Sequence, residues 1–130
     1  MALPFPDDSF DVAVMPLVIF FVPDPAKGVA EMARVVRPGD TIAAYGWALL
    51  EGGFPYAAPH VEMRELGVAP GMPPSPEASR ITVLRHLWTG AGLASVATRA
   101  IDVQRSSTIT VLTGPTQVQA IVSTGHPSAR

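Results

Sequence analysis

Three histidines and eleven acidic residues are among the side chains of this sequence that could transfer a proton. His60 lies in a stretch rich in glycine and proline, where a general base is conceivable, although an exposed histidine with no catalytic role is the simpler interpretation. His86 falls within an apolar periodic segment, and His126 lies near the end of the sequence. No two of them have the spacing of metal ligands, and there is no cysteine and no G-x-S-x-G pattern. The residue types alone therefore predict no metal site, and the catalytic residues stay unknown.

Composition excludes several classes of protein. The 130 residues suffice for one domain, and 48% hydrophobic residues can build a core. Only 15% are charged and the net charge is -2, which argues against a nucleic-acid surface. The longest apolar run, Val12 to Pro23, is shorter than the roughly 20 residues of a membrane span and contains Pro16. With no signal peptide and no cysteine, we expect a cytoplasmic protein without nucleic-acid or membrane partners.

Residues 1–47 read as a strand, a helix and a second strand. Residues 9–15 are almost continuously apolar, which is typical of a strand covered on both faces. Asp24 and Pro25 form a helix start, and an apolar stripe at i, i+3, i+4 and i+7 continues the helix until Pro38 and Gly39 end it. Residues 41–47 are the next strand candidate. This order predicts a parallel βαβ unit.

The rest of the chain divides into three further parts. Residues 48–75 form an irregular excursion or lid, with a possible short helix at 60–66. Residues 76–113 hold a second helix, begun by Ser75 and Pro76, and a strand at 95–104 that 107–112 could extend or follow as a fourth strand. Residues 114–130 read as a tail without a clear signal. The pattern predicts a single α/β domain with a short, mostly parallel sheet.

Three stretches carry a resemblance to a known family. They are LPFPDDSFDV at 3–12, EMARVVRPG at 31–39 and the less specific LRHLWTGAGLASVATRAIDV at 84–103. The sequence resembles the class I S-adenosylmethionine-dependent methyltransferases, in particular the ubiquinone/menaquinone C-methyltransferase-like, methyltransferase type 11 group. The resemblance implies a partial Rossmann-like sheet that holds strands four to six of the family with flanking helices. The first three strands would be missing, and the last strand would lie beyond Arg130.

The resemblance also implies a cofactor and a set of site residues. S-adenosylmethionine would lie with its adenine near Ala2 and Leu3 and its methionine part against Met15 and Pro16. The substrate, a small apolar molecule, would contact Phe20, Tyr45, Trp47 and His60. Met15 as core, Pro16 as a strand end, and Tyr45 and Trp47 as core or rim residues remain alternative interpretations.

The family's glycine-rich cofactor loop has no substitute in this sequence. Residues 67–71, GVAPG, lack its spacing, and Gly90 to Gly92 lie at a helix C-terminus, the wrong end for an anion. Asp40 stands where a second glycine usually follows Pro38 and Gly39. We therefore expect a methyltransferase-like protein that is truncated, and incomplete or inactive as this chain alone.

A truncated sheet would expose an interior strand as its edge, and such an edge tends to pair with another chain. We therefore expect a homo-oligomer, such as a homodimer, through Val12 to Phe21, in which protomers could exchange elements. A methyltransferase subunit completed by another chain is a further possibility. The alternative function is a non-catalytic oligomerisation or small-ligand-binding module that reuses the half-fold.

Overall fold

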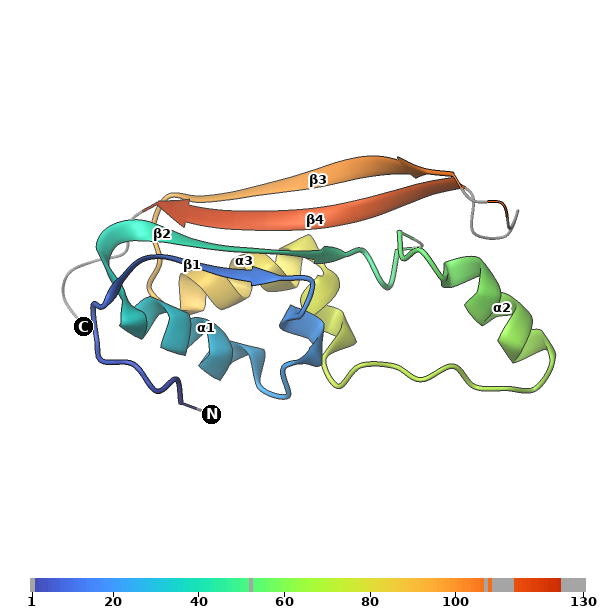
Figure 1. The fold of residues 1–130 in the computed structure, drawn as a ribbon, viewed down its shortest axis with the longest axis horizontal. Coiled ribbons are helices and arrows are strands. Elements are labelled where there is room, and N and C mark those ends of the chain that lie inside the picture. The colour runs from blue at the N-terminus through green and yellow to red at the C-terminus, as the bar shows by residue number, and fades with distance from the viewer. Residues whose placement is uncertain (1, 52, 107, 109–113, 125–130) are drawn as a thin grey trace.

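A computed structural model describes residues 2–51, 53–106, 108 and 114–124. The elements in chain order are β1 (Phe10–Pro16), the 3₁₀ helix η1 (Ile19–Phe21), α1 (Pro25–Val35), β2 (Val36–Trp47), α2 (Ala57–Glu65), the 3₁₀ helix η2 (Pro76–Ser79), α3 (Ile81–Gly90), β3 (Val96–Arg105) and β4 (Gly114–Thr124). The fold is α/β, as the sequence predicts. Figure 1 shows the sheet as one layer, with α1 and α3 together on one of its faces and α2 beyond its end.

The sheet is mixed. Its strand order is β1-β2-β4-β3, with β1 parallel to β2 and with β4 antiparallel to both of its neighbours. Three strands therefore point the same way, which fits the predicted mostly parallel sheet, but β4 makes two of the three pairings antiparallel. Among the described residues β1 has β2 as its sole strand neighbour, so β1 is an edge strand, as expected.

The predicted β1–α1–β2 unit is confirmed, with one shifted boundary. Asp24 caps α1 by accepting a hydrogen bond from the Lys27 backbone N–H at 3.3 Å, and Pro25 occupies the first turn. The helix ends at Val35, before the predicted Pro38 and Gly39 stop, and β2 begins at once. Pro38 and Gly39 instead lie within β2, where the β1–β2 register shifts and Gly39 has a φ of 90°. A positive φ suits glycine, so the two residues shape an irregularity in the strand and not the helix end.

The second helix also begins later than predicted. Ser75 and Pro76 start the 3₁₀ helix η2, and α3 follows from Ile81. The Ser75 side chain does not cap a helix, because its hydroxyl donates to the Val22 carbonyl at 2.6 Å. The Ser75 N–H donates to the Phe20 carbonyl at 2.9 Å. These bonds tie η2 to η1. The short helix predicted at 60–66 is present as α2, which begins three residues earlier.

The C-terminal part differs most from the prediction. The strand expected at 95–104 is confirmed as β3. The sequence gives no clear signal in the tail from Gly114 onward, yet the structure forms β4 at Gly114–Thr124, between β2 and β3. Polar residues such as Gln117 and Gln119 interrupt the apolar pattern of this strand, so periodicity could not find it. Of the possible strand at 107–112, only residue 108 lies within the described residues.

The core lies between the sheet and the two helices on one face. Trp88 of α3 is fully buried there, and its indole N–H donates to the Ile42 carbonyl of β2 at 3.3 Å. The opposite face is open in the described part of the chain, where Val12 and Val14 are 54% and 51% exposed. The expectation that β1 is covered on both faces is therefore wrong for this structure. No helix within the described residues is long and apolar enough to cross a membrane.

Candidate functional site

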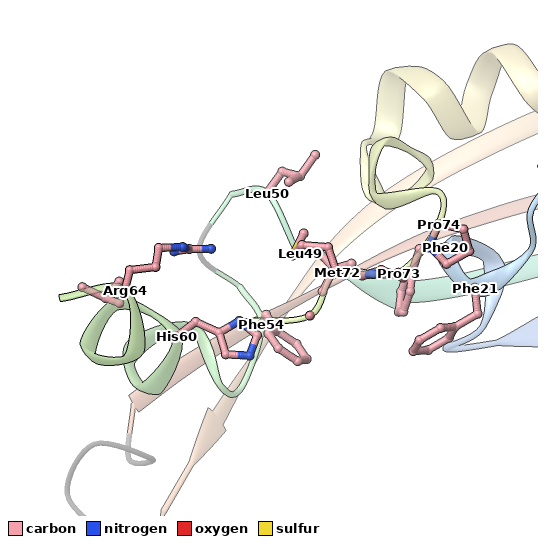
Figure 2. A pocket seen from close by; sticks show the side chains of 12 residues that line it. Phe20, Phe21, Leu49, Leu50, Phe54, His60, Arg64, Met72, Pro73 and Pro74 are labelled. Atoms are coloured by element: carbon pink, nitrogen blue, oxygen red, sulfur yellow. The ribbon is translucent and has the colours of Figure 1, made fainter. Parts of the chain in front are cut away.

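A cavity of about 700 Å³ lies beyond the carboxyl ends of the parallel strands β1 and β2. In open α/β sheets, ligands bind beyond this edge. Residues from four separate segments line the cavity: Phe20, Phe21, Leu49, Leu50, Phe54, His60, Val61, Arg64, Gly71, Met72, Pro73 and Pro74. Figure 2 shows these side chains approaching from η1, from the loop after β2, from α2 and from the segment that leads to η2.

The turn after β1 supplies one wall of the cavity. Leu17 takes a φ of 57°, and its N–H donates to the Tyr45 carbonyl at 2.7 Å, which ends β1 and turns the chain into η1. Phe20 is buried, and its ring contacts that of Phe21 in a tilted arrangement with the ring centroids 5.0 Å apart. A β-carbon at Gly46 would lie 2.9 Å from Phe20 Cε1, so glycine at this position makes room for the ring.

The loop after β2 supplies the second wall, and β4 holds it. The Ala48 N–H donates to the Gln117 carbonyl at 2.9 Å, and the Gln117 N–H donates to the Gly53 carbonyl at 3.0 Å. A β-carbon at Gly53 would lie 2.7 Å from Gln117 Cβ, so the close approach of loop and strand requires glycine. This pairing positions Leu49, Leu50 and Phe54, which all line the cavity.

Helix α2 supplies the polar part of the lining. The His60 ring lies 5.4 Å from the Phe54 ring, measured between centroids. Arg64 follows one helical turn later, and both side chains leave α2 toward the loop that carries Leu50 and Phe54 (Figure 2). Within the described residues, no carboxylate pairs with Arg64.

A buried polar group lies next to the cavity wall, on β4. Gln119 is buried and its Nε2 donates to Glu51 Oε2 at 2.8 Å, while Glu51 Oε1 lies 3.9 Å from Arg80 Nη1. Glu51 is therefore already partnered and does not line the cavity. The lining of the cavity is apolar apart from His60 and Arg64. No group of three metal-ligating side chains occurs among the residues that the structure describes.

The structure brings two of the four predicted substrate residues together. Phe20 and His60 line the same cavity. Tyr45 lies on the open sheet face, in a shallow depression between β2, β3 and β4. Successive residues of a strand point to opposite faces, so Tyr45 points away from the face on which Gly46 meets Phe20. Trp47 is half-buried against the core.

The four residues predicted to contact the cofactor differ in their exposure. Ala2 and Pro16 are exposed, whereas Leu3 and Met15 pack against the core. The Leu3 N–H donates to Glu31 Oε1 at 2.7 Å, and its carbonyl accepts from Arg34 Nη2 at 3.1 Å. The assignment of these four residues to the cofactor therefore stays a prediction.

Glu31 and Arg34 of α1 bind the N-terminal residues 3–7. Arg34 Nε donates to Glu31 Oε2 at 2.6 Å, and Arg34 Nη1 donates to Asp7 Oδ1 at 2.7 Å. The hydrogen bond from Arg34, together with that from the Leu3 N–H, lowers the pKa of Glu31 to about 2. Glu31 and Asp7 raise the pKa of Arg34. Glu31 and Arg34 are thereby committed to holding residues 3–7 in place.

Several lining residues were not found from the sequence. Leu49 and Leu50 follow directly after a parallel strand, and that position is a signal for a ligand site that could have been used. Phe54, Arg64 and Met72 lie in the irregular excursion, where no periodic pattern brings them together.

Residues 1–44 match the family model described as "Methyltransferase domain". An uncharacterized protein of Mycobacterium bovis is 36% identical over 74 residues, which make up 57% of this chain and 27% of that protein. The demethylmenaquinone methyltransferase of Desulfitobacterium hafniense is 46% identical over 48 residues, 37% of this chain and 19% of that enzyme. The matched part thus spans about a quarter of the length of these curated relatives or less.

The fold has solved counterparts. A SAM-dependent methyltransferase from Methanosarcina mazei superposes with a TM-score of 0.62 at 17% identity, over 96% of this chain and 63% of the other. This likeness establishes the fold, and the match of residues 1–44 adds a sequence relationship. The chain therefore has the fold of S-adenosylmethionine-dependent methyltransferases, and its residues 1–44 are similar in sequence to a methyltransferase domain.

Proposed function

We propose that this chain takes part in S-adenosylmethionine-dependent transfer of a methyl group to a small molecule in the cytoplasm, and that the cavity beyond β1 and β2 holds the methyl acceptor. The observation that carries the proposal is the position of this cavity at the carboxyl edge of the parallel strands, in a chain whose residues 1–44 match a methyltransferase domain.

The cavity has the apolar lining that is needed to orient a methyl acceptor and to exclude water. In this reaction class S-adenosylmethionine supplies an electrophilic methyl group, and the enzyme orients the acceptor in a site that excludes water. Phe20, Phe21 and Leu49 offer apolar surface against which an acceptor can be fixed. His60 is the lining residue that could accept a proton from the acceptor.

Calorimetric titration with S-adenosylhomocysteine tests the proposal. The titration is made on this chain alone and on the chain joined to the sequence that precedes Met1 in its gene. We expect the joined protein to release heat on binding, and this chain alone to bind much more weakly, because its sequence offers no substitute for the family's glycine-rich cofactor loop. Absence of binding by both proteins would overturn the proposal.

A second candidate function is an oligomerisation module. The observation that favours it is the edge position of β1 among the described strands, with Val12 and Val14 exposed on the open sheet face. An exposed apolar edge strand offers unpaired backbone groups to a second copy of the chain. This candidate predicts a stable oligomer that S-adenosylhomocysteine does not affect.

A further inference from the structure

We propose that the acceptor cavity selects an amphiphilic anion, that is, a molecule with an apolar body and a carboxylate, sulfonate or phosphate group. This inference rests on the proposed function, because it concerns the same cavity. It goes further in stating which chemistry the cavity recognises.

The apolar body is indicated by the walls. Phe20, Phe21, Phe54 and Met72 come from three different segments, and their side chains converge on one space of about 700 Å³. A cavity of this volume falls in the usual range for small-molecule sites, in which apolar lining binds the body and a few polar groups fix its orientation.

The anionic group is indicated by the charge of the lining. Arg64 is the sole permanently charged side chain among the described lining residues, and no described carboxylate pairs with it. Four other arginines each donate a side-chain hydrogen bond to an oxygen of the chain itself: Arg34, Arg37, Arg80 and Arg85. Arg64 therefore keeps its guanidinium donors for a ligand.

The location of Arg64 agrees with this role. It lies four residues after His60, so the two side chains lie on one face of α2. His60 stands beside Phe54, within the apolar part of the cavity, and Arg64 lies one turn further along the helix. A ligand can thus lay its apolar body against Phe54 while its anionic group reaches the guanidinium.

Two fluorescent probes with the same aromatic skeleton test the inference on the purified chain. 1-Anilinonaphthalene-8-sulfonate carries an anionic group, and N-phenyl-1-naphthylamine lacks it. We expect the anionic probe to bind about tenfold more tightly than the neutral one, as one charge-assisted hydrogen bond allows. Arg64→Gln should remove this difference and leave the affinity for the neutral probe unchanged.

Two further variants establish where the probes bind. Phe54→Ala should weaken both probes, because it removes part of the apolar wall. Arg99→Gln is the matched control, since Arg99 lies in the depression on the open sheet face, a second place where such probes could bind. Circular dichroism checks that each variant is folded.

The outcomes separate this inference from the proposed function. Equal affinity for the two probes, or loss of the anionic preference in Arg99→Gln and not in Arg64→Gln, would overturn the inference. A preserved anionic preference in the purified chain, together with no S-adenosylhomocysteine binding by either this chain alone or the joined protein, would overturn the methyl-transfer proposal and leave the anion site standing.

Discussion

Gly46 of β2 lies directly against the ring of Phe20, so close that a β-carbon at position 46 would stand 2.9 Å from Phe20 Cε1. The contact joins a central strand to the 3₁₀ helix that walls the cavity. Because aromatic rings and backbone are both stiff, a β-carbon at this position must displace the ring.

Gly46→Ala is therefore expected to destabilise the fold and to alter the cavity together. Overpacking of this kind costs about 1–3 kcal/mol in the free energy of unfolding. Urea denaturation measures that loss, and N-phenyl-1-naphthylamine binding reports the change in the cavity. Gly90→Ala is the control, since a β-carbon there would meet no atom within 4 Å. Equal effects of the two substitutions would contradict the proposed role of Gly46.

The first half of the fold was largely readable from the sequence. The Asp24–Pro25 start, the apolar stripe of α1 and the two flanking strands are local signals, and each agrees with the structure. The exact end of α1 was not readable, because Pro38 and Gly39 are equally compatible with a helix stop and with an irregular strand, and only the pairing of β1 with β2 decides between them.

The site was readable only in part. The resemblance predicts Phe20 and His60 as site residues, and both line one cavity, whereas Tyr45, near the end of β2, lies in the depression on the open sheet face. The wall formed by Leu49, Leu50 and Phe54 depends on pairing with β4. That pairing joins positions more than 60 residues apart in the chain, which no local pattern can anticipate.

The ion pair between Glu31 and Arg34 should make the free energy of unfolding depend on pH in the acidic range. The pKa of Glu31 falls from its usual value of 4.5 to about 2 in the folded protein. Folding thus favours the ionised carboxylate, so the stabilisation is complete above pH 4.5 and is lost as the pH falls toward 2. Thermal unfolding followed between these limits should show a smaller acid dependence for Glu31→Gln than for the unchanged chain.

Glu65→Gln is the control for that measurement, because Glu65 is exposed at the end of α2. The unfolding temperature of this control should depend on pH as that of the unchanged chain does. An identical acid dependence for Glu31→Gln and the unchanged chain would show that the ion pair does not contribute in the folded state.

Ser75→Ala should loosen the contact between η1 and η2 and thereby the cavity wall at Pro73 and Pro74. The Ser75 hydroxyl donates to the Val22 carbonyl at 2.6 Å in a partly buried position, and removal of such a bond costs about 1 kcal/mol. We expect faster amide hydrogen exchange at the Ser75 N–H, which is bonded to the Phe20 carbonyl. Ser9→Ala removes an exposed hydroxyl bonded to the Pro6 carbonyl, and it should leave that exchange rate unchanged.

Val14→Lys tests whether the edge of the sheet joins two copies of the chain. Val14 is 51% exposed on β1, and a lysine on an edge strand opposes pairing with another strand. If a second copy pairs there, sedimentation velocity will show an oligomer for the unchanged chain and a shift toward monomer for Val14→Lys. Leu66→Lys is the control, because Leu66 is 82% exposed and lies outside every strand. A monomer at all concentrations for the unchanged chain would contradict the oligomerisation module, whereas an oligomer broken equally by both lysines would place the contact away from β1.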